Sequence, residues 1–326
     1  MIVNVGPDGD FRTINEAICA VPYEESATIR IAAGIYREKL FIEKKDIRIE
    51  GVGMDDTVIE YADGAEEKMP DGARRGTFRS QTMFLGGKRC VLKDLSVINS
   101  AGPGEIAGQA VALYADAESV YLENVELSSY QDTLFTAPLP VAEKQPNGFL
   151  GPRVLTERKL TKQYYKNCRI IGNVDFIFGG ADAVFDGCDI IVRNRSKEIN
   201  GYITAPGDNP GRLGYAFLNC RITGEDPDMK ESVFLGRPWR SEGKAAFLSC
   251  RYDGCIHPLR FSEWGMTYAE ESNAHFAEYA PADIQGNPIS TDGRNPWVRL
   301  LDDNEAKVIY DICSDIHKTV YPPDMR

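Results

Sequence analysis

The sequence predicts an all-β fold in which short parallel strands wind into a β-helix. A strand pattern repeats along the chain, Gly- and Asn-rich corners separate short strands, and the intervening loops vary in length. The 326 residues contain no low-complexity linker, so we expect one domain spanning residues 1–326.

Each repeat has an aromatic or apolar residue, two further residues, a polar or cysteine position, and an apolar residue one or two places on. The polar or cysteine position falls at Asp94, Asn124, Cys168, Cys188, Cys220 and Cys250. A single coil cannot bury its own apolar face, so stacked coils would share one core. We interpret the four cysteines as small buried side chains that stack inside the helix, rather than as reactive thiols.

Helical patterns near both ends predict short capping helices. Thr13 and Glu16 match a T-x-x-E capping box, and apolar residues follow at helical spacing as far as Val21. Residues 302–316 carry a second apolar stripe at helical spacing. Such helices would cover the open strand edges of the terminal coils.

Charge and composition exclude several classes of function. The net charge of −12 disfavours nucleic acid and anionic membranes as partners, and also anionic polymers unless a local basic patch overrides it. The cysteines are too dilute for a disulfide scaffold and lack metal-ligand spacing. No histidine neighbours a Ser or Cys in a nucleophile motif, although distant residues can assemble a triad.

The start of the chain bears on the compartment. No positively charged segment followed by an apolar run is visible there. We expect a cytoplasmic protein, and the alternative is a secreted protein whose leader has been removed. We also expect a monomer.

Two short segments each hold one aspartate among apolar neighbours. Residues 130–134 read Tyr-Gln-Asp-Thr-Leu, and residues 172–179 read Gly-Asn-Val-Asp-Phe-Ile-Phe-Gly. Burying a charge is expensive unless it has a partner, so these carboxylates are hard to explain as surface residues. Brought together, Asp132 and Asp175 would form a general acid/base or nucleophile pair.

The repeat predicts that these aspartates meet. Asp132 follows Asn124, and Asp175 follows Cys168, at offsets that differ by one residue. Similar offsets place side chains at similar angles on neighbouring coils, which lie about 4.8 Å apart. A one-residue difference would turn a side chain to the other face of a regular strand, so a strand end or bulge is expected there.

Two further segments stand out. The stretch 135–162 is rich in Pro and Gly and longer than the roughly 15 residues usual for a loop. It leaves the scaffold beside Asp132, so we interpret it as a wall or lid over the site, with a solvated insertion as the alternative. Residues 234–239 place Arg237 and Trp239 around a proline, which suits sugar binding, or else a turn with a core Trp and a surface Arg.

At these residues the chain resembles the pectin methylesterases, or pectinesterases, and in particular their bacterial type. The resemblance runs nearly end to end. It is carried by residues 9–18, by Gly-Ile-Tyr-Arg-Glu at 34–38, and by four site motifs at 108–113, 130–134, 172–179 and 235–239. It implies a right-handed parallel β-helix and hydrolysis of methyl esters on galacturonate units of pectin, with release of methanol and without a metal or organic cofactor.

The resemblance also implies roles for individual residues. Asp175 would be the nucleophile, Asp132 the general acid/base, and Arg237 the partner that holds the Asp175 carboxylate. Gln131 and Gln109 would stabilise the oxyanion. The residues expected to line the sugar cleft are Trp239, Phe178, Phe135 and Val174. The substrate would be pectin or a methylated oligogalacturonide.

Two other classes remain open from the residues alone. A β-helix glycosidase or lyase on the same polymer would also use carboxylates. However, the sequence shows no acidic cluster of the kind that a calcium-dependent lyase needs. A non-catalytic carbohydrate-binding β-helix would not need Asp132, Asp175 and Arg237 together.

Overall fold

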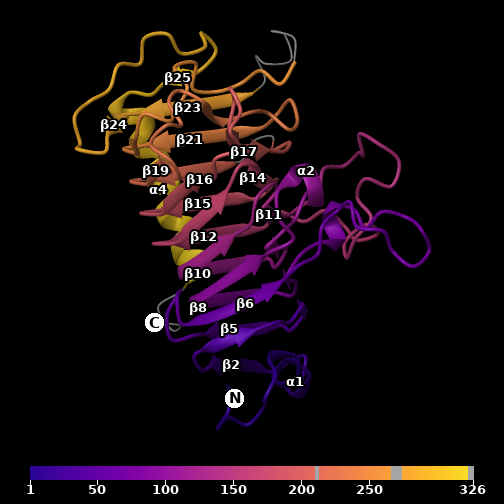
Figure 1. Ribbon diagram of the computed structural model, residues 1–326. Helices are drawn as coiled ribbons and strands as arrows, with labels where there is room; N and C mark the ends of the chain where they lie inside the picture. The colour runs from indigo at the N-terminus through magenta and orange to yellow at the C-terminus, as the bar shows by residue number, and fades with distance from the viewer. Residues whose placement is uncertain (210–212, 266–273, 322–326) are drawn as a thin grey trace.

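Short parallel strands wind into a β-helix in the computed structural model, which describes residues 1–209, 213–265 and 274–321. In Figure 1 the coils stack from the indigo N-terminal coil at the bottom to the last, orange coils at the top. Among these residues the strands form one sheet of eighteen strands and one of seven. Every strand pairs in parallel with the equivalent strand of a neighbouring coil, as Leu134 with Ile177 and Phe217 with Phe247 illustrate.

The larger sheet contains β1 (Ile2–Val5), β2 (Ser26–Ile31), β3 (Gly34–Tyr36), β5 (Asp46–Glu50), β6 (Thr57–Tyr61), β8 (Arg89–Asn99), β10 (Ser119–Ser128), β12 (Lys162–Lys166), β13 (Arg169–Gly172), β15 (Asp182–Asp186), β16 (Asp189–Val192), β18 (Tyr215–Leu218), β19 (Arg221–Gly224), β21 (Lys244–Leu248), β22 (Arg251–Tyr252), β23 (His275–Tyr279), β24 (Ala282–Asp283) and β25 (Arg299–Leu300). The smaller sheet contains β4 (Leu40–Ile42), β7 (Met83–Leu85), β9 (Leu113–Ala115), β11 (Leu134–Thr136), β14 (Val174–Gly179), β17 (Gly201–Pro206) and β20 (Val233–Gly236). The helices are α1 (Ile14–Ala20), α2 (Gly104–Ala107), α4 (Asp303–Val320) and the 3₁₀ turn η1 (Thr77–Arg79).

The core consists of side chains stacked in columns along the helix axis. Tyr165, Phe185, Phe217 and Phe247 lie on successive coils with ring centroids 4.3–4.7 Å apart and nearly parallel planes. The four cysteines predicted to stack, Cys168, Cys188, Cys220 and Cys250, are all free and buried. Their burial raises the pKa of the Cys168 and Cys220 thiols. Equivalent residues of neighbouring coils are separated by the spacing of parallel strands, about 4.8 Å. Small side chains and flat rings can therefore stack directly on one another in these columns.

The predicted repeat position needs a one-residue correction. Asp94, Asn124 and Asn167 occupy the same corner of successive coils, each with φ between 51° and 55°. Asn and Asp are the side-chain-bearing residues that best tolerate this left-handed conformation. Cys168 comes one place later and points inward, so Asn124 aligns with Asn167 rather than with Cys168.

The N-terminal helix is confirmed and the C-terminal helix lies elsewhere than expected. Thr13 and Glu16 form the predicted capping box of α1, which packs on β1, β2 and β4 of the first coil. Helix α4 is not a short cap on the last coil: it extends to Val320 and runs along the flank of the larger sheet, beside β10 and β12 (Figure 1). Its end is anchored by Tyr321, whose ring stacks 4.1 Å from that of Tyr121. No helix of the described residues is long and apolar enough to span a bilayer.

Candidate active site

Asp132 and Asp175 occupy equivalent places on neighbouring coils. Leu134 pairs with Ile177, so the strand register aligns the two aspartates, and the Asp132 amide donates to the Val174 carbonyl at 3.0 Å. Counted from the left-handed corner residues, Asp132 follows Asn124 and Asp175 follows Asn167 at the same offset, so the expected one-residue difference disappears. Both aspartates have left-handed backbones, with φ of 65° at Asp132 and 50° at Asp175, and the pairing of β14 with β17 shifts register at this point. The expected irregularity is therefore present.

Arg237 holds one of the two carboxylates. It follows β20 directly, and its Nε and Nη2 donate to the two carboxylate oxygens of Asp175 at 2.8 and 2.7 Å. Such a bidentate pair fixes the orientation of the carboxylate as well as balancing its charge. The Arg237 guanidinium is stacked between two rings, 3.9 Å from the Tyr202 centroid and 3.8 Å from the Trp264 centroid. The arginine therefore has little freedom to turn away from Asp175.

Burial and neighbouring charges act differently on the pKa values of the two aspartates. Burial raises the pKa of Asp175, and the hydrogen bonds and charge of Arg237 oppose that rise. Burial raises the pKa of Asp132 well above its usual value, the Asp175 charge raises it further, and Arg237 opposes both only through its charge. Neighbouring carboxylates with such different support take different protonation states. This difference favours the carboxylate form at Asp175 and the protonated form at Asp132.

A cleft of about 320 Å³ lies over these groups. Of the residues singled out from sequence, those that line it are Gln109, Gln131, Asp132, Asp175, Phe178, Arg237 and Trp239. Phe135 and Val174, expected at the sugar cleft, do not line it. Phe135 is fully buried beneath the floor, between Phe78 and Phe178, and Val174 is a buried strand residue whose carbonyl binds Asp132. Phe135 lies on the same sheet face as its register partner Phe178, but neighbouring rings, Phe78 among them, cover it.

Three aromatic residues at the cleft escaped the sequence analysis. Phe78 and Phe149 line it and meet edge to face at a centroid distance of 5.8 Å, and Trp264 completes the lining beside Arg237. Phe149 lies in the long stretch already interpreted as a wall. Phe78 lies in the 3₁₀ turn η1 and Trp264 in a loop, and nothing in the local sequence of either indicates a role.

The stretch 135–162 packs on the scaffold. Its first two residues belong to β11 and its last to β12, and no helix or strand occurs between them. Leu139 and Phe149 are buried against the outer face of the smaller sheet, and Arg153 forms ion pairs with Asp116 and Glu43. A purely solvated insertion would not bury these side chains, so the stretch forms a wall of the cleft.

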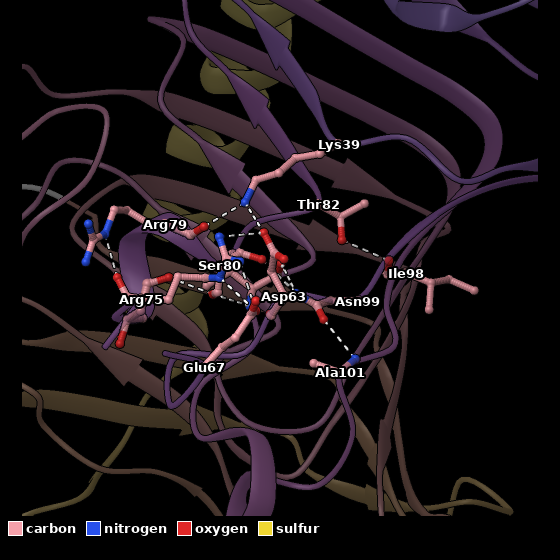
Figure 2. Close-up of polar contacts among 12 residues, drawn as sticks. Lys39, Asp63, Glu67, Arg75, Arg79, Ser80, Thr82, Ile98, Asn99 and Ala101 are labelled. Carbon is pink, nitrogen blue, oxygen red and sulfur yellow. Dashed lines mark hydrogen bonds and ion pairs between the residues drawn. The ribbon is translucent and has the colours of Figure 1, made fainter. Parts of the chain in front are cut away.

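A network of charged groups anchors the loop that carries Phe78 (Figure 2). Asp63 is buried and pairs with both Lys39 and Arg75, and Lys39 also donates to the Arg79 carbonyl at 2.7 Å. The Asn99 amide donates to the backbone carbonyls of Asp63 and Ser80 at 3.0 and 2.8 Å. These contacts fix both ends of the segment 63–80, and with it η1 and Phe78 at the edge of the cleft.

Other parts of the described chain offer no comparable site. A larger hollow of about 560 Å³ is lined by Glu43, Asp116 and Arg153, but these charges already pair with one another. It contains neither aspartate of the pair, so we place the chemistry in the smaller cleft. Within residues 1–209, 213–265 and 274–321, no group of three His, Cys, Asp or Glu side chains is arranged to hold a metal ion.

The fold and site define a parallel β-helix with an aspartate pair and an arginine in an aromatic cleft. The Pectinesterase family model matches residues 1–139 and 157–310. A probable pectinesterase/pectinesterase inhibitor of Arabidopsis thaliana is 32% identical over 94% of this chain, and the chain spans about half (48%) of that relative's length. Pectinesterase 31 of the same plant is 31% identical over 94% of this chain and 89% of its own.

Solved structures of pectin methylesterases also match this chain. Pectin methylesterase from carrot superposes with a TM-score of 0.77 at 28% identity, over 93% of this chain and 89% of that one. The chain belongs to the pectinesterase family, and the predicted right-handed parallel β-helix is confirmed. The particular resemblance to the bacterial type is not borne out, because the curated relatives matched above are plant proteins.

Proposed function

We propose that this protein hydrolyses methyl esters of galacturonate units in pectin or its oligosaccharides and releases methanol. The observation that carries the proposal is the Asp175 carboxylate held through both oxygens by Arg237, with the buried Asp132 aligned on the next coil. Membership of the pectinesterase family supports it. A solved pectin methylesterase in complex with a hexasaccharide supports an oligosaccharide as ligand.

The first half of the reaction forms an acyl-enzyme. The Asp175 carboxylate attacks the ester carbonyl carbon, and the carbonyl electrons move onto oxygen. The side-chain amides of Gln109 and Gln131, which line the cleft, donate hydrogen bonds to this oxyanion. A donor of this kind contributes about 2.7–4 kcal/mol in other acyl-transfer enzymes. When the tetrahedral intermediate collapses, the bond to the methoxy oxygen breaks and Asp132 gives that oxygen its proton, so methanol leaves.

The second half restores the enzyme. Asp132, now a carboxylate, takes a proton from water as the water oxygen attacks the acyl carbon of the mixed anhydride. The bond to the Asp175 oxygen breaks, the galacturonate carboxyl is released, and Asp175 is again a carboxylate paired with Arg237. Arginine suits this place because it stays protonated throughout.

Two substitutions test the assignment. Asp175→Asn and Asp132→Asn should each lower methanol release from methylated pectin at least about a thousandfold, since each removes a group that acts in the transition state. Asparagine tolerates the left-handed backbone of both positions, so the variants should fold. Asp94→Asn, at another left-handed aspartate remote from the cleft, is the control. Near-normal release from either variant would refute the proposal, and shortening of the polymer by the wild type would point to a glycosidase instead.

The cytoplasmic location and the monomeric state expected from the sequence stay predictions.

A further inference from the structure

The strands that precede the two aspartates end at the same corner of the β-helix. Strand β10 ends shortly before Asp132, and β13 ends shortly before Asp175. The two segments that follow these strands are joined directly, because the Asn173 amide donates to the Tyr130 carbonyl at 2.8 Å. The position of one carboxyl group relative to the other therefore depends on how this corner is held.

Arg193 lies at this corner on the next coil. It comes directly after β16, which pairs with β13 so that Val192 is opposite Gly172. Its backbone amide continues this ladder and donates to the Gly172 carbonyl at 2.7 Å. Through its backbone, Arg193 is therefore attached to the start of the segment that leads to Asp175.

The Arg193 side chain binds the other segment, which leads to Asp132. Its Nε donates to the Ser129 carbonyl at 2.8 Å, and its Nη2 donates to the Ser128 hydroxyl at 3.0 Å. The guanidinium carbon also lies 4.7 Å from the centroid of the Tyr130 ring. One planar group thus contacts three successive residues, and its rigid fork fixes both the place and the direction of that segment.

These contacts lie outside the cleft. Arg193 does not line it, and the Arg193 side chain is 23% exposed. The serines that it binds, Ser128 and Ser129, are buried. Its Nη1 also donates to the carboxylate of Glu225 on the following coil at 3.4 Å, which helps to hold the guanidinium in place. An effect of Arg193 on the reaction would therefore pass through the two chain segments that it joins.

We propose that Arg193 is a positioning residue that fixes the Asp132 carboxyl group relative to the Asp175 carboxylate. The inference deepens the proposed function and rests on it. In that reaction the Asp132 proton must reach the methoxy oxygen on the same carbon that Asp175 attacks, so the two groups have to keep one mutual geometry. A displacement of about 1 Å, caused by a change far from the reacting atoms, can lower a rate about a hundredfold.

The test measures kcat and KM separately for methanol release from methylated pectin. The variants are Arg193→Met, which removes the guanidinium, and Arg193→Lys, which keeps a positive charge. Arg169→Met is the matched control. Arg169 also joins the coils of the two aspartates, through its bond to Glu126 at 2.7 Å, but it does so at the start of β13 rather than at its end. Urea denaturation shows that each variant is folded under the assay conditions.

Arg193→Met should lower kcat about tenfold to a hundredfold and leave KM within about twofold, because it changes the geometry of the aspartates and not the contacts with the sugar. Arg193→Lys should recover only part of kcat, since an ammonium group cannot reproduce the planar fork. Arg169→Met should keep the wild-type kcat.

Three outcomes would overturn the positioning role. They are a wild-type kcat in Arg193→Met, full recovery in Arg193→Lys, and an equal fall of kcat in Arg193→Met and Arg169→Met, which would mean a general loss of rigidity. If Arg193→Met did not fold, Arg193→Lys would carry the test: a lowered kcat with unchanged KM would support the role, and a wild-type kcat would overturn it.

A measurement without turnover separates this inference from the proposed function. NMR of protein labelled with ¹³C at the aspartate carboxyl groups follows the titration of Asp132, whose signal is identified by its absence in Asp132→Asn. The Asp175 charge raises the pKa of Asp132, so Asp175→Asn should lower that pKa. The lowering should be smaller when Arg193→Met is also present, because two like charges that are no longer held in place move apart.

The two readouts can fail independently. If the wild type released no methanol while Arg193→Met reduced this coupling between the aspartates, the proposed function would fail and the positioning role would stand. If methanol was released and Arg193→Met changed neither kcat nor the coupling, the positioning role would fail and the esterase would stand.

Discussion

At the scale of single residues, the site depends on two aspartates with an uncommon backbone. Both have positive φ, which Asp and Asn accept more readily than other side-chain-bearing residues. This conformation is what aims both carboxylates at the cleft from the ends of their strands. An alanine at either position would combine loss of the carboxylate with backbone strain, so asparagine is the informative replacement.

The protonation of Asp132 predicts how stability changes with pH. Burial raises its pKa in the folded state, whereas an unfolded aspartate loses its proton near pH 4. Between these two pKa values the folded chain keeps a proton that the unfolded chain has lost. The stability that Asp132 contributes is therefore fully present below the unfolded pKa and is lost as pH rises through the folded pKa.

Asp132→Asn should remove this loss of stability at rising pH. Relative to the wild type, the variant should gain stability as pH rises from 4 to 8, by roughly 1 kcal/mol or more, because an unpaired buried charge is no longer formed. Thermal unfolding at several pH values measures it. Asp94→Asn, at a half-buried aspartate with the same backbone, should show a smaller change. A difference between Asp132→Asn and wild type that stayed constant over this pH range would contradict the assignment of Asp132 as the protonated acid.

At the scale of elements, loops rather than strands complete the cleft. Strands β11, β14 and β20 position Asp132, Asp175 and Arg237. The segment 63–80 and the stretch 135–162 supply Phe78, Phe149 and Lys144. Each loop is fixed by buried side chains and ion pairs. In Figure 1 both project from the same side of the helix.

Asp63→Asn should disturb the loop that carries Phe78. It would leave Lys39 and Arg75 without their shared carboxylate. Breaking a fully buried pair costs about 3–5 kcal/mol, and we expect about 2–3 kcal/mol here because Lys39 stays partly exposed. Urea denaturation measures the stability, and methanol release should fall as Phe78 shifts. Asp71→Asn, an exposed position of the same loop, is the control. Equal stability of the two variants would show that the network does not hold the loop.

At the scale of the whole molecule, stability comes from columns that run through many coils. A change in one coil is felt by both neighbours because each ring stacks on the next. Phe217→Ala, in the middle of the aromatic column, should lower the free energy of unfolding by about 3–5 kcal/mol. Phe41→Ala is the matched control, since Phe41 is 48% exposed, and it should lose far less. Similar losses in urea denaturation would mean that the column is not the main source of stability.

Net charge predicts opposite salt effects for long and short ligands. A long de-esterified polymer meets the whole chain at −12, so its binding should tighten as added salt screens the repulsion. A short acid oligosaccharide meets mainly the cations of the cleft, so its binding should weaken with salt. Affinity measurements at about 0.02 and 0.2 M salt distinguish the two. Polymer binding that tightened at low salt would show that the local cations dominate over the net charge.

The sequence by itself determined the β-helix, the first helix, and the aspartate pair with its arginine. Local preferences express these features: the capping box, the inward columns, the left-handed corners, and carboxylates among apolar residues. Only the tertiary structure decided the one-residue alignment of the corners, the place of α4 along the flank, and the burial of Phe135. It also brought Phe78, Lys144 and Trp264 to the cleft. These depend on how coils and loops far apart in the chain pack against one another, and no local pattern encodes that packing.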